Sequence, residues 1–212
     1  MQLIGMLDSP YVRRVAISMR LLGLPFEHRS LSVFTTFDEF QRVNPVVKAP
    51  TLVCDDGGLL IDSTLILDYA QCLGGPSRVL MPEALDAKTQ ALRVIGLALA
   101  ACEKTVQVIY ERNLRPTDKH HQPWLDRILG QLAAAYSALE REVREHPLAS
   151  TRDTITEDGI TAAVAWTFTQ LILPGVVSAD QHPVLSELTS RLETLPEFLA
   201  FPPDGPGVPS TD

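Results

Sequence analysis

The chain has 212 residues, enough for one large domain or two small ones, and 45% of them are hydrophobic, which supplies a sizeable core. It carries 18 Lys and Arg against 26 Asp and Glu, and this net charge of −8 argues against nucleic acid or an anionic membrane surface as a partner. The charge is uneven, with a net −1 in residues 1–78 and −7 in residues 79–212, so the first third is the better place for an anionic small ligand.

The cysteines are three in number, widely spaced, and match no metal-ligand pattern. They indicate reduced, mostly buried thiols and therefore a cytoplasmic protein. No signal peptide precedes the first apolar run, and the longest apolar run, residues 94–102, is far too short to span a membrane. We therefore expect no metal site, no membrane partner and no nucleic acid.

The chain opens with a strand, a tight turn and a helix. Residues 2–7 form a short apolar run typical of a buried strand, and apolar residues at spacings of three and four then predict an amphipathic helix. Ser9 has an N-cap side chain, Pro10 stands at the first helical position, and Gly23 ends the helix. The turn therefore presents a hydroxyl at a helix N-terminus, where backbone N–H groups stabilise an anion or a thiolate.

The elements that follow complete an alternation of strands and helices over residues 1–76. A strand at 26–31 and a short helix at 37–43 precede two strands joined by an Asp-Asp-Gly-Gly hairpin turn at 55–58. Ser63 then caps a third helix, which ends at Gly74 and Gly75. The expected order is βαβαββα.

Everything beyond a linker at residues 76–85 reads as helical. One helix, at 157–173, is apolar on more than one face and belongs in a core. We predict an all-α helical bundle domain at 86–201 and, because of its prolines and glycines, a disordered tail at 202–212. The other helices are expected at 83–112, 124–143, 183–192 and 196–200.

Three motifs give the chain a family resemblance. The order βαβαββα looks like the thioredoxin superfamily, although Ser9-Pro10-Tyr11-Val12 stands where that superfamily carries a Cys-Pro-Tyr-Cys type motif, so dithiol chemistry is not available at this turn. With a helical block behind it, the chain resembles a bacterial cytosolic glutathione S-transferase over nearly its whole length. The motifs that carry the resemblance are Ser9 to Val15, Asn44 to Leu52 and Ile61 to Tyr69.

The resemblance implies a glutathione-binding site in the first domain, with glutathione as a co-substrate and no tightly bound cofactor. Asp62 would bind the γ-glutamyl amino group, and Ser63 with the helix N–H groups its carboxylate. Pro50 would follow a cis peptide bond that turns the backbone of Ala49 toward a peptide-like ligand. Lys48 could pair with the glycyl carboxylate. The alternatives are a simple N-cap for Ser63, a trans bond at Pro50 and a solvated surface lysine.

By the same resemblance, Ser9 would hydrogen-bond the glutathione sulfur and stabilise its thiolate. Lowering a thiol pKa from roughly 8.5 by about two units needs roughly 2.7 kcal/mol of preferential stabilisation of the anion. A charge-assisted hydroxyl bond and a helix N-terminus can supply much of it. Tyr11 is the competitor for this role, although packing or a substrate-side wall is the commoner use of its position.

The second substrate, a small hydrophobic electrophile, would lie between the two domains. The resemblance makes Tyr11, Val106, Tyr110 and Trp166 candidates for lining its pocket. For Trp166 a place in the protein core is the stronger alternative.

Two residues depart from the family pattern. Val47 stands where the family usually has Gly before the lysine. Gly159 stands where the family's central helix has the Asp of a capping box begun by Thr156, unless Asp158 takes that role one residue early. A weaker helix start is therefore expected, and Gly159→Asp should raise the melting temperature.

These residues predict a glutathione transferase that acts as a homodimer in detoxification. Two alternatives stay open: a glutathione-dependent peroxidase or reductase, which the cysteine-free turn disfavours, and a non-catalytic protein that uses a transferase-like fold for binding.

Overall fold

The computed structural model describes residues 1–209, which group into two compact units. The first unit holds Met1–Met81 together with Leu195–Gly205, and the second holds Pro82–Thr194 and the described residues from Pro206 onward.

The linker predicted at residues 76–85 contains the first boundary between the units. The return of the chain to the first unit at Leu195 was not predicted. The short helix α8 (Pro196–Leu199) therefore belongs to the first unit and not to the helical domain in which the sequence analysis placed it.

A four-stranded sheet forms the centre of the first unit, with strand order β2-β1-β3-β4. β1 is parallel to β2 and antiparallel to β3, and β3 is antiparallel to β4. The interspersed helices give the predicted order βαβαββα. The strands are β1 (Gln2–Ile4), β2 (Glu27–Arg29), β3 (Thr51–Val53) and β4 (Leu59–Ile61), and the helices are α1 (Pro10–Leu21), α2 (Phe37–Val43), α3 (Ser63–Gly74) and the 3-10 turn η1 (Gly75–Ser77).

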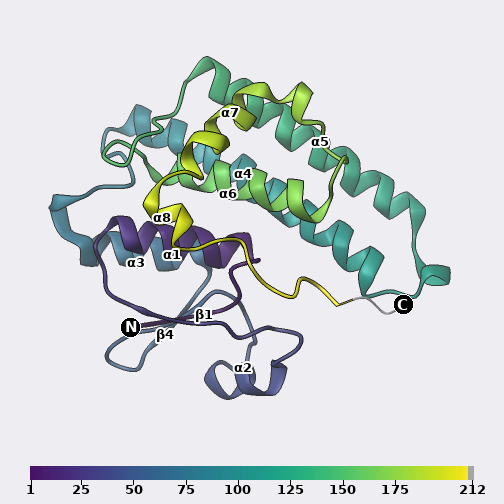
Figure 1. Ribbon diagram of the computed structural model, residues 1–212, viewed down its shortest axis with the longest axis horizontal. Coiled ribbons are helices and arrows are strands. Elements are labelled where there is room, and N and C mark those ends of the chain that lie inside the picture. The colour runs from purple at the N-terminus through teal and green to yellow at the C-terminus, as the bar shows by residue number, and fades with distance from the viewer. Residues whose placement is uncertain (210–212) are drawn as a thin grey trace. The chain divides into compact units, whose positions relative to one another are not determined.

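Helices cover both faces of this sheet (Figure 1). Helices α1 and α3 lie side by side on one face, and α2 lies on the other, where Phe40 packs against Ile4 and Leu31. Leu3 and Ile4, neighbours on the central strand β1, point to opposite faces and are both fully buried. The sheet is therefore a rigid base for the loops that leave its edge.

Helix α1 has the ends that its sequence predicts. Ser9 is the N-cap and Pro10 begins the helix. Gly23 lies in the left-handed region with φ 71°, its N–H donates to the carbonyl of Arg20, and the N–H of Leu24 donates to the carbonyl of Met19. This pair of bonds is a Schellman motif, which glycine favours because it has no Cβ.

The helices of the second unit form a bundle (Figure 1). Helix α6, predicted to be apolar all round, is buried along most of its length and packs on α4 and α7. The helices are α4 (Leu85–Asn113), α5 (Gln122–Glu145), α6 (Glu157–Ile172) and α7 (Pro183–Leu192), with the 3-10 turns η2 (Thr117–Lys119) and η3 (Ala179–Gln181).

A buried hydroxyl cluster joins three of these helices. The hydroxyl of Tyr136 on α5 lies 2.8 Å from the Ala165 carbonyl and 2.7 Å from Thr169 Oγ1 on α6, and Thr169 in turn lies 2.8 Å from Thr105 Oγ1 on α4. Burial raises the pKa of Tyr136 well above its ordinary value, so its phenol stays protonated. The cluster satisfies polar groups that would otherwise be costly to bury.

The start of α6 has no capping box: the Thr156 side chain makes no capping hydrogen bond, and Asp158 does not take the reciprocal role that one alternative gave it. Asp158 accepts a hydrogen bond from the backbone N–H of Gly159 at 3.0 Å and another from the Thr156 hydroxyl. Gly159 is buried, and a Cβ added to it would lie 3.5 Å from the Ala149 carbonyl oxygen and 3.5 Å from Ile155. The position has room for a methyl group but offers a carboxylate only a carbonyl oxygen and apolar neighbours.

The expectation for Gly159 is accordingly revised. Gly159→Ala should raise the melting temperature by about 2–4 °C, because alanine is favoured over glycine inside a helix by about 1 kcal/mol. Gly159→Asp should lower it, since a buried carboxylate beside a carbonyl oxygen is destabilising. Calorimetric melting measures both, with Gly130→Ala on α5, where a Cβ meets nothing within 4 Å, as a matched control for the helix preference alone. An Asp variant that melts above the wild type would contradict this view of the site.

The C-terminal tail makes hydrogen bonds within both units over its described part. The Asp204 N–H donates to the Pro202 carbonyl at 2.8 Å in the first unit, and Asn113 Nδ2 donates to the Val208 carbonyl at 3.2 Å in the second. The predicted disorder of the tail stays a prediction. Its last part, 210–212, lies outside the described residues.

Candidate functional site

Three loops of the first unit meet at one edge of the sheet. Ile4 on β1 pairs with Thr51 on β3, and Thr51 pairs with Ile61 on β4. One step beyond these partners, β1 leads into the turn that carries Ser9, β3 begins after Pro50, and β4 leads into Asp62. The strand register therefore gathers the three predicted groups of ligand-binding residues at the same edge.

Close packing at this edge requires a glycine. Gly5 follows β1 with φ 141°, and a Cβ there would lie 2.6 Å from Val12 Cγ2 and 3.2 Å from the Ala49 Cβ. Only a residue without a side chain lets the turn approach both α1 and the loop before β3.

Ser9 stands at the N-terminus of α1 with its hydroxyl able to donate. Its Oγ accepts a hydrogen bond from the Val12 N–H at 3.5 Å, and its backbone N–H donates to the Met6 carbonyl at 3.2 Å. Because Oγ is the acceptor in the capping bond, the hydroxyl proton is not used by it. A thiolate placed here would receive that proton in a hydrogen bond and would lie near the positive end of the helix dipole.

The start of α3 is held by an arginine of α1 that the sequence analysis did not single out. Arg14 is 1% exposed, and its Nη1 donates to Ser63 Oγ at 3.1 Å and to Thr64 Oγ1 at 3.3 Å. Each hydroxyl accepts from the guanidinium and so keeps its own proton for another acceptor. Two hydroxyls polarised by a buried positive charge, at a helix N-terminus, suit a carboxylate.

Exposure differs among the residues at the start of α3. Ser63 is buried, whereas its neighbours Asp62 and Thr64 are exposed. Thr64 was not predicted as a site residue, although a second hydroxyl in the first turn of a helix is a readable sign. Asp62 is the N-cap, and its Oδ1 accepts from the Thr64 N–H at 2.9 Å. Asp62 also has φ 25°, a strained conformation for a residue other than glycine.

The loop before β3 is fixed by buried side chains. Asn44 donates through Nδ2 to Thr51 Oγ1 at 2.8 Å and accepts from the Val46 N–H at 3.0 Å, while Thr51 Oγ1 donates to the Lys48 carbonyl at 2.6 Å. The peptide bond between Ala49 and Pro50 is cis, as the family resemblance implies, and the alternative of a trans bond is excluded.

The Val47 departure has a structural consequence. Val47 has φ 52°, in the left-handed region. Glycine, the family's usual residue here, adopts this conformation without steric strain, whereas a β-branched residue is strained by roughly 1–2 kcal/mol. The Val47 side chain packs against the cluster of Ile4, Leu31 and Phe40, and this burial offsets part of the strain.

Comparison with known proteins identifies the family that the sequence motifs resemble. Residues 3–77 match the family model described as glutathione S-transferase, N-terminal domain. A glutathione transferase family member from Pseudomonas fluorescens Pf-5, solved with bound S-(propanoic acid)-glutathione, is 30% identical with a TM-score of 0.80, over 97% of this chain and 100% of the other. The chain belongs to the glutathione S-transferase family.

Other relatives agree over most of the chain. A glutathione S-transferase from Methylobacterium radiotolerans, in complex with glutathione sulfonate, is 27% identical with a TM-score of 0.86, over 100% of this chain and 95% of the other. The GST-like protein YibF of Escherichia coli is 22% identical over 175 residues, which is 82% of this chain and 86% of YibF. The fold is thus a thioredoxin-like domain followed by a helical domain, as in other glutathione S-transferases.

The other predicted site residues of this family member fall into two groups. Lys48 is exposed, and its predicted role toward the glycyl carboxylate stays a prediction. Tyr11 belongs to the first unit and Val106 and Tyr110 to the second, so the electrophile pocket that they were predicted to line also stays a prediction.

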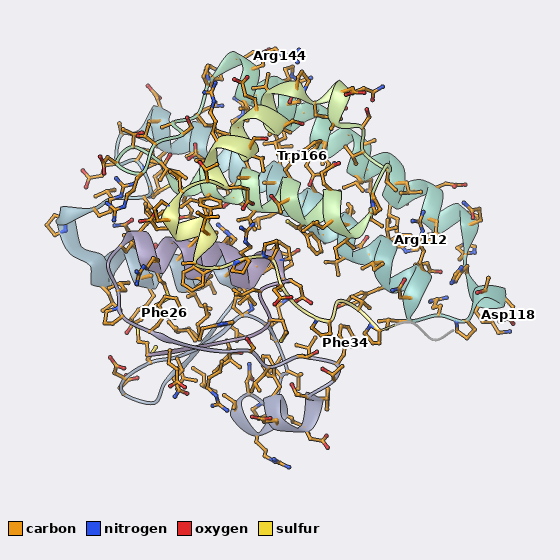
Figure 2. All side chains as sticks on the ribbon, in the orientation of Figure 1. Phe26, Phe34, Arg112, Asp118, Arg144 and Trp166 are labelled. Atoms are coloured by element: carbon orange, nitrogen blue, oxygen red, sulfur yellow. The ribbon has the colours of Figure 1, made fainter. Side chains whose placement is uncertain are left out.

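Trp166 is a core residue. It is 4% exposed, and its ring meets Tyr136 edge-on at 5.1 Å between centroids and lies 5.4 Å from the His182 ring, all within the helical unit (Figure 2). The structure therefore favours the core alternative over a place in the electrophile pocket, because the side chain is buried among residues of the helical unit.

Metal-binding groups and membrane-spanning helices are absent from the described residues. Among residues 1–209 no group of His, Cys, Asp and Glu has the arrangement to hold a metal ion. None of the described helices is both long and apolar enough to cross a membrane. All three cysteines are free thiols: Cys54 and Cys102 are buried and Cys72 is exposed.

Proposed function

We propose that this protein is a glutathione transferase, which binds reduced glutathione, stabilises its thiolate at Ser9 and adds it to small hydrophobic electrophiles. The observation that carries the proposal is the hydroxyl of Ser9 at the N-terminus of α1, at the same sheet edge as the cis-Pro50 loop and the start of α3. Two solved relatives support it, since one holds glutathione sulfonate and the other a thioether of glutathione.

In this proposal each part of the edge receives one part of the ligand. The γ-glutamyl carboxylate lies at the hydroxyls of Ser63 and Thr64, and Asp62 receives the amino group. The backbone of Ala49 pairs with the ligand's cysteinyl backbone, as an added strand would. Lys48 reaches the glycyl carboxylate, and the sulfur then lies at Ser9.

The chemical step needs only the thiolate. Ser9 donates its hydroxyl proton in a hydrogen bond to the sulfur, and the helix N-terminus adds a favourable field, so that the thiol ionises below its ordinary pKa of roughly 8.5. The thiol proton passes to solvent, and the thiolate forms a bond to the electrophilic carbon. The electron pair displaced there leaves with a leaving group or, in an addition to a double bond, takes up a proton from solvent, and the thioether is released as product. Tyr11, Val106 and Tyr110 are the proposed contacts of the electrophile.

The assembly and the compartment are also proposals. Exposed leucines on α3 (Leu65 and Leu73) and, in the other unit, on α4 (Leu85 and Leu92) support a homodimer, because exposed large apolar side chains favour burial against a partner. The three free thiols support a cytoplasmic location, and conjugation of electrophiles there would serve detoxification.

Calorimetric titration with reduced glutathione tests the proposal. Binding in the micromolar to low-millimolar range is expected, with a large fraction of one proton released at neutral pH, because the thiol ionises as it binds. Titrations in two buffers of different ionisation enthalpy measure the proton. S-methylglutathione is the matched control, since it should bind without releasing a proton from sulfur.

The outcomes separate the candidate functions. Binding with proton release supports a transferase. Binding without proton release would indicate a protein that binds glutathione but does not activate its thiol. Absence of binding would indicate that the transferase-like fold serves a function without glutathione. Either result overturns the proposed activity.

A further inference from the structure

The end of the chain forms a strap on the first unit, defined here as residues 201–205. It follows α8, which packs against α1 (Figure 1). The Phe198 side chain of α8 is fully buried, with its ring centroid 5.6 Å from the guanidinium carbon of Arg13. The Phe201 ring stacks on the ring of Phe26, with 5.8 Å between the ring centroids (Phe26 in Figure 2). The strap is therefore anchored at its start by two aromatic contacts.

Arg13 ties this strap to α1, the helix that Ser9 caps. The Arg13 side chain donates through Nε to the Phe201 carbonyl at 2.8 Å, and its backbone N–H donates to the Ser9 carbonyl at 3.0 Å. Arg13 is buried, so neither bond competes freely with water. The Arg13 side chain thus holds the beginning of the strap at α1, and its backbone bond to Ser9 is the first regular hydrogen bond of that helix.

The other end of the strap lies directly on Asp8, the residue before Ser9. A Cβ added to Gly205 would lie 2.8 Å from the Asp8 Cβ and still closer to the Asp8 carboxylate. Real Cβ atoms do not approach other heavy atoms so closely, so any side chain at position 205 must move Asp8 or lift the strap. Gly205 has no left-handed φ, which means that the contact with Asp8, and not the backbone conformation, restricts the position to glycine.

We propose that the strap is a positioning element for the thiolate site, with Gly205 and Arg13 as the positioning residues that fix the Asp8–Ser9 turn. This proposal rests on the proposed role of Ser9. Gly205 meets the turn at Asp8, and the Arg13 side chain keeps the strap in this place by holding its beginning at the Phe201 carbonyl. A hydroxyl that must meet a sulfur within hydrogen-bond distance depends on such support, because a displacement of about 1 Å can cost as much as 100-fold in rate.

Gly205→Ala tests the proposal. Gly205 is exposed, so the substitution is not expected to affect folding. We expect kcat/KM for conjugation to fall about 10-fold and the pKa of the bound glutathione thiol to rise by about one unit, because the Ser9 hydroxyl is displaced. The Kd of S-methylglutathione should stay within about twofold, since its binding does not use the thiolate. Gly130→Ala is the matched control: a Cβ there meets nothing within 4 Å, and both quantities should stay at wild-type values.

A double-mutant cycle with Asp8→Gly shows whether the effect passes through Asp8. Without the Asp8 side chain the added methyl group has room, so Gly205→Ala should change kcat/KM by less than about twofold in that background. An equal loss in both backgrounds, or a Gly205→Ala enzyme with wild-type kcat/KM and thiol pKa, overturns the strap proposal and leaves the proposed transferase intact. A wild-type protein that shows no thiolate with bound glutathione overturns both.

Discussion

Ser9→Ala is expected to lower kcat/KM for glutathione conjugation by roughly 100-fold or more, the loss typical when one preorganised donor to a developing or bound anion is removed. In the structure the Ser9 hydroxyl stands at the first turn of α1, and its proton is not used by the capping bond to Val12. Without it the pKa of the bound thiol should return most of the way toward roughly 8.5, so that the rate of the variant keeps rising with pH where the wild-type rate has levelled.

Binding and stability should change much less. The rest of glutathione is held at the start of α3 and at the cis-Pro50 loop, so the Kd of S-methylglutathione should stay within about threefold. Removal of an N-cap side chain costs about 0.5–2 kcal/mol, and the low end is expected because the Ser9 capping bond is long, at 3.5 Å. Rates measured well below the melting temperature then report the thiolate and not unfolding.

Two further variants make this result specific. Ser32→Ala is the matched control, since Ser32 Oγ also accepts backbone hydrogen bonds in a turn, from Phe34 and Thr35, and its loss should leave conjugation unchanged. Tyr11→Phe tests the competitor. If the Tyr11 variant lost the thiolate while Ser9→Ala kept it, the tyrosine would be the activating residue and our assignment would be wrong.

Local chemistry explains why so much of the fold was predictable. The strand, turn and helix around Ser9 are encoded by neighbours in sequence: an N-cap serine, a proline at the first helical position and a glycine at the end. The same holds for the hairpin between β3 and β4 and for the apolar pattern of α6. Such signals act within a few residues, and a single sequence displays them directly.

Long-range pairing explains what was missed. Arg14 sits 49 residues from Ser63, and Arg13 sits 188 residues from Phe201, so no local pattern distinguishes these buried arginines from charges on a solvated helix face. The prolines and glycines of the tail predicted disorder, and composition does not show that Phe201, just before it, contacts Arg13 and Phe26. Trp166 shows the same limit, since only packing reveals that Tyr136 and His182 surround its ring.

Arg14→Met is expected to raise the Kd of glutathione by roughly 10- to 100-fold. The Arg14 guanidinium donates to both hydroxyls at the start of α3, and hydrogen bonds that involve charged groups contribute about 1.5–3 kcal/mol each. Methionine fills much of the same volume but leaves Ser63 and Thr64 without the positive charge that polarises them. The loss should therefore fall on the γ-glutamyl carboxylate, the part of the ligand that we place at these hydroxyls.

A ligand without that carboxylate separates this role from a general structural one. In 4-aminobutanoyl-cysteinyl-glycine a hydrogen replaces the carboxylate, and the wild type should bind it far more weakly than glutathione. Arg14→Met should bind the two ligands with nearly equal affinity, because the interaction that distinguishes them is gone. A variant that loses the same factor for both ligands would show that Arg14 only supports the fold of the site.

Two companion variants guard against a trivial failure. Arg14→Lys keeps a positive charge but loses the fork of donors, so it should retain part of the preference for glutathione even if the methionine variant is unstable. Ser63→Ala removes one hydroxyl while leaving Arg14 in place. If the guanidinium acts through that hydroxyl, the double variant Arg14→Met with Ser63→Ala should lose less than the product of the two single losses, since both substitutions break the same chain of bonds from α1 to the ligand.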